Sequence, residues 1–259
     1  MRHETEIAFR RKVCAIWLDQ GMALAAQDLP WPDAKPALSQ AIATVNPGAE
    51  TIRKVLEHIR RIWFEPPEGL ALLRSEALRL FRAETSPDSQ ILLNWGMSIA
   101  AYPFVGSVAE ALGRLLKLQS EANRADVQRR LREQYGDRDF VNRITRYNIS
   151  SFLDWGIIAE GDKGGIYTPT KQRNPKRTEQ LAWLAEALLI SRDKTQMPLS
   201  ELYSHPALFP IALQALNASA LQTNPRLRVE RQSLNQDFVF LHVEPPRQKR
   251  PHSRFTLSA

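Results

Sequence analysis

The sequence is poor in cysteine, with only Cys14 among its 259 residues. A single thiol excludes a disulfide-stapled scaffold and any zinc site made of cysteines, and it is typical of the reducing cytoplasm, where we expect this protein to be found. Glycine is scarce as well, with 11 residues against 17 prolines, which excludes collagen-like and low-complexity chains. The remaining composition, 43% hydrophobic and 24% charged, indicates a soluble globular protein of two or three small domains.

Signatures of catalysis are missing too. The sequence has no GxxxxGK[ST] or GxGxxG phosphate-binding loop and no GxSxG nucleophile motif. Its five histidines are scattered, and no two of them stand at the spacing of metal ligands. We therefore predict a protein that is not an enzyme and that uses neither a metal ion nor an organic cofactor.

No long apolar run continues without a break. Residues 89–109 carry no charged side chain, and a stretch of this length could cross a bilayer. Polar and small residues interrupt it, however, and Tyr102-Pro103 breaks the helical pattern. We predict two short buried helices, 88–101 and 104–119, and no membrane insertion.

Basic residues are in excess. Lys and Arg total 35 against 28 Asp and Glu, which gives a formal net charge of +7. An excess of this size favours a polyanionic partner such as a nucleic acid. Part of the excess lies in the tail, residues 245–259, which is rich in proline near its start and is predicted to be disordered.

The first third has helical periodicity interrupted by prolines. Apolar residues recur every three or four positions over 4–26, 49–64 and 70–81, which predicts three helices. The prolines between Leu29 and Pro36 predict a loop. Residues 1–85 are therefore predicted to form a helical bundle domain.

The middle third, residues 86–172, has the element order of a winged helix-turn-helix. One helix ends at Gly136, and a longer one follows over 138–155. Two short strands, 157–160 and 166–170, flank a turn rich in glycine. Helix, tight turn, helix and hairpin together predict a winged-helix domain.

The last third, residues 173–244, repeats this order less regularly. The elements predicted there are helices over 178–190, 199–203 and 210–221, and strands near 227–229 and 238–241. The predicted fold is therefore mainly α, with an N-terminal helical bundle, a central winged helix-turn-helix and a C-terminal helical domain that carries a second winged hairpin.

The helix over 138–155 is the predicted DNA-reading element. Steps of 100° per residue place one set of apolar side chains on an inward half: Val141, Ile144, Ile149, Phe152 and Leu153. The outward half carries arginines, which read guanine edges in the major groove, and polar residues that reach phosphates or bases. A lysine stands at the tip of the predicted wing, and a basic run follows the hairpin. The predicted DNA-binding residues are Arg138, Asn142, Arg143, Arg146, Tyr147, Ser150, Lys163, Lys171, Arg173, Lys176 and Arg177.

Three stretches of the sequence indicate a relationship: TIRKVLEHIRRIW at 51–63, ILLNWGMSIAAYPF at 91–104 and LDWGII at 153–158. In this layout, over residues 40–170, the chain resembles the BrxA-type small proteins of BREX phage-defence systems. The resemblance implies an all-helical, non-catalytic protein that binds double-stranded DNA in a prokaryotic defence system, with other defence-system proteins as partners. The extended C-terminal third departs from the compact picture of that family, and the resemblance assigns no site residues.

Two other functions stay open on the sequence alone. Winged helices also serve as protein–protein modules, so the chain could be an adaptor that binds partner proteins. It could also be a transcriptional regulator of its own operon, which would normally dimerise on a palindromic site. One basic face joining Arg143, Arg146, Lys163, Lys171 and Arg173 would favour DNA, whereas dispersed charge beside an apolar patch would favour the adaptor.

Overall fold

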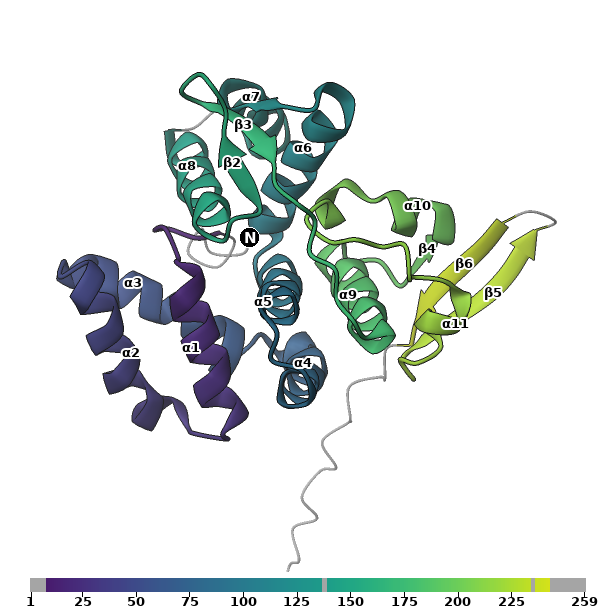
Figure 1. The fold of residues 1–259 in the computed structure, drawn as a ribbon, viewed down its shortest axis with the longest axis horizontal. Coiled ribbons are helices and arrows are strands. Elements are labelled where there is room, and N and C mark those ends of the chain that lie inside the picture. Colours follow the sequence, from purple (N-terminus) through teal and green to yellow (C-terminus); the bar gives the residue numbers. More distant parts are fainter. Residues whose placement is uncertain (1–7, 137–138, 234–235, 243–259) are drawn as a thin grey trace, which may run out of the picture.

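The computed structural model of the chain describes residues 8–136, 139–233 and 236–242 (Figure 1). It is mainly helical and has two small antiparallel sheets, as the sequence predicts. Buried apolar side chains from Ala8 to Leu241 form one cluster, so a continuous core runs through all three predicted domains. The predicted disordered tail, 245–259, lies outside the described residues.

The N-terminal helices are α1 (Ala15–Ala26), α2 (Trp31–Val45), α3 (Ala49–Ile59) and α4 (Ala71–Ala83). Helix α3 continues into a π-helical turn, Arg60–Phe64, so the helices predicted over 49–64 and 70–81 are confirmed. Trp63 of this turn is buried. Its Nε1 donates to Asn94 Oδ1 at 3.0 Å, which links the turn to the helix that contains Asn94.

Two predictions in this region are wrong. The residues from Ala8 to Cys14 are not helical, because they are bound to another helix described below. The loop predicted around residues 29–36 is the start of α2. Pro32 lies in its first turn, where the backbone N–H has no partner within the helix, so a proline there removes no hydrogen bond. Pro36 lies deeper in α2 and has no N–H to donate, so the helix loses one backbone hydrogen bond there.

Helix α5 (Pro87–Ala101) is the central helix and contacts α4, α6 and α9. Ser86 caps it by accepting from the Ser89 N–H. The chain then breaks at Tyr102, and α6 (Pro103–Gln119) leaves at an angle of 117°. Both helices are largely buried, which confirms the prediction of two short buried helices. Within the described residues, no single helix is long and apolar enough to cross a membrane.

Residues 103–169, called here the first unit, contain a helix, a strand, two helices and a hairpin. After α6 these are β1 (Ala122–Asn123), α7 (Arg124–Tyr135), α8 (Asp139–Asp154), β2 (Ile158–Glu160) and β3 (Ile166–Pro169). The sheet order is β1-β3-β2, with all pairs antiparallel. Strand β1 has only two residues, too few for a pattern to reveal it.

Residues 178–241, the second unit, repeat this order. The elements are α9 (Thr178–Ser191), β4 (Gln196–Pro198), α10 (Leu199–Ser204), α11 (Ala218–Leu221), β5 (Leu227–Ser233) and β6 (Gln236–Leu241). The sheet order, β4-β6-β5, again places the last strand in the middle. The helix predicted over 210–221 is wrong except for α11. Its first residues cannot be helical, because Pro210 and Ala212 are hydrogen-bonded to the backbone of Arg173 instead.

Candidate nucleic-acid interface

Helix α8 has the inward and outward faces that the sequence predicts. Val141, Ile144, Ile149 and Phe152 are buried, and Leu153 is partly buried against the same core. On the opposite side Arg143 and Arg146 are exposed, while Asn142, Tyr147 and Ser150 are half-buried. Arg138 lies outside the described residues.

The flank of α8 between these faces is occupied by residues 8–14. Asn148 Nδ2 donates to the Phe9 carbonyl at 3.4 Å, and Ser151 Oγ accepts from the Val13 N–H at 2.9 Å. Trp155 Nε1, just past the helix, donates to the Val13 carbonyl at 2.8 Å. The segment therefore runs along α8 and fixes it to the N-terminal helices. Asn148 and Ser151 are polar residues on the inward side, and this was the only signal of the contact in the sequence.

The end of α8 is fixed by charge. Lys12 Nζ lies 2.8 Å from Asp154 Oδ2, and the Ala15 N–H donates to Oδ1 at 2.8 Å. Burial alone would raise the pKa of Asp154, but the hydrogen bonds from Lys12 and Ala15 outweigh it and hold the pKa below its ordinary value. The same hydrogen bond raises the pKa of Lys12. This pair is therefore fully charged near neutral pH and does not add to the free cations of α8.

The β2–β3 hairpin is attached to the start of α7. The Arg124 N–H donates to the Gly165 carbonyl at 2.8 Å, where Gly165 has a φ of 84° that favours glycine. Lys163 in the turn is exposed. Because the chain reverses after α8, the turn lies toward the same end of the unit as the start of α8 (Figure 1). The predicted wing lysine is thus exposed in a turn that is bound to the start of α7.

The basic run after the hairpin serves two purposes. Lys171 and Lys176 are exposed. The Arg173 guanidinium instead donates to the Gly156 carbonyl at 2.8 Å and approaches the Trp155 carbonyl at 3.4 Å, just beyond the end of α8. Arg177 pairs with Glu179 at 3.3 Å. Residues 170–177, called here the linker, connect the two units. Arg173 therefore fastens the linker onto the first unit, and its side chain is less free to bind a ligand than those of the two lysines.

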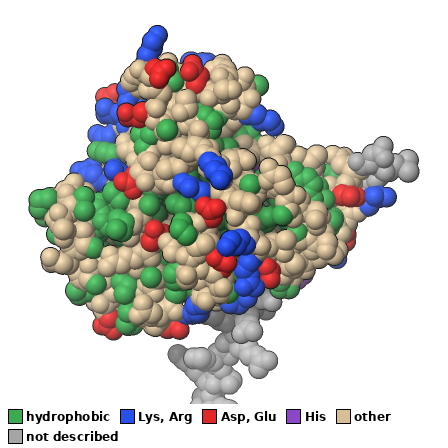
Figure 2. Space-filling view, viewed as in Figure 1, with side chains coloured by type: hydrophobic (Ala, Val, Ile, Leu, Met, Phe, Trp, Pro, Cys, Tyr) green, Lys and Arg blue, Asp and Glu red, His purple; other side chains and the backbone are tan. Residues whose placement is uncertain are grey.

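Sequence reasoning missed three cations near α8. Arg10, Arg11 and Lys54 line a hollow of about 530 Å³ together with Arg143 and Tyr147. Figure 2 shows Lys and Arg side chains, with acidic ones among them, along the edge of the molecule where Figure 1 places α8. The cations that line the hollow therefore come both from the first unit and from the N-terminal part of the chain.

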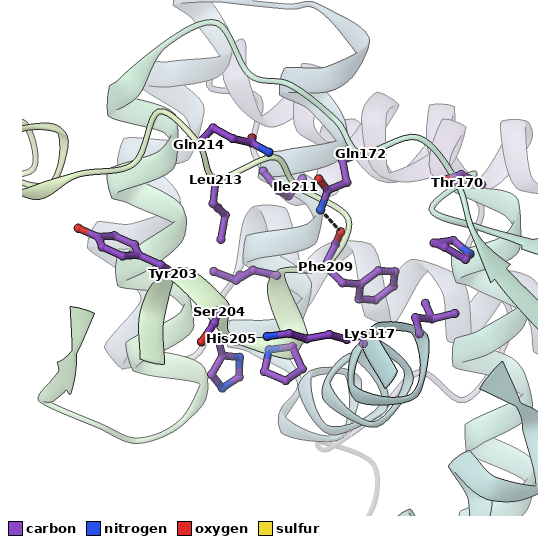
Figure 3. Close-up of a pocket in the computed structure, with 15 residues that line it drawn as sticks. Lys117, Thr170, Gln172, Tyr203, Ser204, His205, Phe209, Ile211, Leu213 and Gln214 are labelled. Atoms are coloured by element: carbon purple, nitrogen blue, oxygen red, sulfur yellow. Dashed lines mark hydrogen bonds between the residues drawn. The ribbon is translucent and has the colours of Figure 1, made fainter. Parts of the chain in front are cut away.

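A larger cavity of about 640 Å³ lies where α6 meets the linker and the chain after α10 (Figure 3). Its walls combine apolar and polar side chains, and Lys117 is the only Lys or Arg among the described residues that line it. His205 is buried there, and its Nδ1 accepts from the Ala207 N–H at 3.2 Å, so it caps the short helical turn Pro206–Leu208. Burial, with the nearby charge of Arg192, lowers the pKa of His205 to about 4.

Comparison with family models, with curated proteins and with solved structures gives no match for this chain. Within the described residues, no group of His, Cys, Asp and Glu side chains could hold a metal ion. The feature that distinguishes the surface is the exposed cationic face of α8, with the cations that the hairpin and the N-terminal segment bring near it.

Proposed function

We propose that the protein binds double-stranded DNA, without catalysing a reaction on it, through a winged helix-turn-helix formed by the first unit. The observation that carries the proposal is the outward face of α8. Arg143 and Arg146 are exposed there, and neither has an acidic partner among the residues that the structure describes. The order of the elements, with two helices followed by a hairpin, supports it.

The dimensions of α8 suit this role. A helix of 16 residues is about 24 Å long. The major groove of B-DNA is about 12 Å wide and admits one helix. In this arrangement Arg143 and Arg146 reach base edges or phosphates, Tyr147 and Ser150 bind phosphates at the rim, and Lys163 contacts the backbone from the hairpin. A place in a prokaryotic phage-defence system, beside other defence proteins, rests on the resemblance to BrxA-type proteins alone.

Salt-dependent binding tests the proposal. We expect the protein to bind a generic duplex in low salt, with log affinity falling against log salt by about 0.9 for each phosphate contacted. Fluorescence anisotropy with a labelled duplex measures this slope. The Arg143→Ala/Arg146→Ala double variant should lose most of the affinity.

The matched control is Arg228→Ala/Arg231→Ala, which removes two exposed arginines from the hairpin of the second unit. It changes the net charge equally and should leave the affinity near that of the wild type. Absence of duplex binding by the wild type even in low salt would overturn the proposal and favour the adaptor.

A further inference from the structure

Three segments that are distant in the sequence bring positive charge to the hollow beside α8. Arg10 and Arg11 precede α1, Lys54 belongs to α3 and Arg143 to α8. Every charged side chain that lines the hollow is positive. The remaining lining residues are Phe140, Ile144 and Tyr147. These cations repel one another, and the fold nevertheless holds them close together. An anion that binds in the hollow would relieve this repulsion.

Two of the four cations have no carboxylate partner among the described residues. Arg11 Nη1 donates to the Arg10 carbonyl at 3.0 Å and to Tyr147 Oη at 3.2 Å. The Arg143 guanidinium lies 5.7 Å from the centre of the Phe140 ring. These contacts position the two guanidinium groups without neutralising them. Arg10 and Lys54 are paired with Glu57 and Glu50, residues that do not line the hollow.

The cations of the hollow also lie close to a buried histidine. His58 is buried beside Arg10, whose N–H donates to its Nε2 at 3.0 Å. Burial is the main reason that the pKa of His58 falls to about 3, and the charges of Arg10, Arg61 and Lys54 lower it further. The Tyr147 hydroxyl accepts from Arg11, which leaves its own O–H to donate to a ligand.

We propose that this hollow binds a phosphate group, and that in the DNA-bound protein it holds one backbone phosphate of the duplex on which α8 docks. The inference rests on the proposed function for the duplex as the source of the phosphate. Arginine forks and a hydroxyl donor match the oxygens of a phosphate, and the volume of about 530 Å³ leaves room for the neighbouring sugars. The N-terminal segment thereby becomes part of the DNA-binding surface.

Duplex binding by Lys54→Gln is the first test. Loss of one phosphate contact should weaken binding to all sequences alike and reduce the salt slope by about 0.9. Arg11→Gln is a second variant with the same expectation, and thermal melts verify that both are folded. The control is Lys194→Gln, which also removes one charge and one surface ion pair, that with Glu201 at 2.9 Å. Its slope should equal that of the wild type.

Melting in inorganic phosphate is the second test and separates the two sources of the ligand. At equal ionic strength, phosphate instead of chloride should raise the melting temperature of a protein that binds free phosphate, and the gain should vanish in Lys54→Gln and Arg11→Gln.

Unchanged salt slopes in these variants, with binding still lost in Arg143→Ala/Arg146→Ala, would overturn the duplex contact while the proposed function stands. A phosphate-specific gain would then assign the hollow to a free phosphorylated compound, and its absence would overturn the phosphate site altogether. If the wild type binds no duplex, the proposed function fails and the melting experiment alone decides the hollow.

Discussion

The two units have the same order of elements and the same strand order, but their third helices differ. In the first unit this helix is α8, with 16 residues and an outward face that exposes Arg143 and Arg146. In the second unit it is α11, with four residues, no charge, and Ala220 and Leu221 buried. A single helical turn cannot fill a major groove. Under the proposed function, the order of elements is not enough to make a binding surface, because the third helix must also be long and charged.

The first helix of the second unit, α9, belongs to the core of the molecule. In α9 all residues from Gln180 to Leu189 are buried, since the helix contacts α4 on one side and α5 and α11 on others. A helix buried all round belongs to the core. Glu186 inside it accepts from Asn224 at 2.7 Å and pairs with Arg226 at 2.9 Å, which attaches the second hairpin. The second unit therefore stabilises the fold, and the first unit presents the charged surface.

The largest effect should follow from a change in the core of the second unit. Trp183 is buried against Gly96 of α5, and its Nε1 donates to the Leu73 carbonyl at 2.9 Å. Trp183→Ala should lower the free energy of unfolding by about 3–5 kcal/mol. The exposed Leu118→Ala should change it by no more than about 0.5 kcal/mol. Chemical denaturation measures both, and a small loss in Trp183→Ala would contradict the structural role of α9.

A smaller effect should separate reading from docking within the first unit. Arg146→Ala, which leaves the basic hollow intact, should cost about 1–3 kcal/mol of affinity at a preferred duplex and flatten the sequence preference. Lys163→Ala should weaken all duplexes alike and reduce the salt slope by about one. Neither side chain lies in the core, so both variants should melt like the wild type. Wild-type affinity in both variants would show that α8 and its hairpin are not the binding surface.

The effect that is smallest near neutral pH, and that grows with acidity, is a pH dependence of stability, which compares His58, beside the first unit, with His205 in the second. In the folded protein the pKa of His58 falls from 6.5 to about 3, chiefly through burial, and that of His205 falls to about 4 for the same main reason. The unfolded chain then binds more protons below pH 6.5, so the free energy of unfolding decreases as pH falls, by up to about 1.4 kcal/mol per pH unit for each histidine.

Asp19 acts in the opposite sense, because burial raises its pKa from 3.8 to about 6. Single variants therefore have to be compared with the wild type. His58→Gln should flatten the dependence from pH 6.5 down to about 3, and His205→Gln only down to about 4. Denaturant titrations at several pH values measure the slopes. If His58→Gln kept the wild-type slope, the buried neutral histidine would not be a determinant of acid stability.

Local sequence determined much of the architecture. The spacing of apolar residues fixes the inward face of α8, since a helix brings residues three and four apart to one side. Tyr102-Pro103 fixes the break between α5 and α6, and Gly165 permits the tight hairpin turn. Ser86 and Asn123 begin helices because their side chains accept backbone N–H groups, from Ser89 and Ala125. Such features depend on neighbours within a few positions along the chain.

Tertiary structure alone decided the rest. Strands β1 and β4 are too short for a period and exist through pairing with β3 and β6. Residues 8–14 look helical by periodicity, yet their backbone groups bind side chains far along the chain: Arg10 bonds His58, 48 positions away, and Val13 bonds Ser151, 138 positions away. The basic hollow has the same origin, because Arg11, Lys54 and Arg143 meet only when the N-terminal segment lies on α8. A local pattern holds no information about such partners, since their contact energy arises only after the chain has folded.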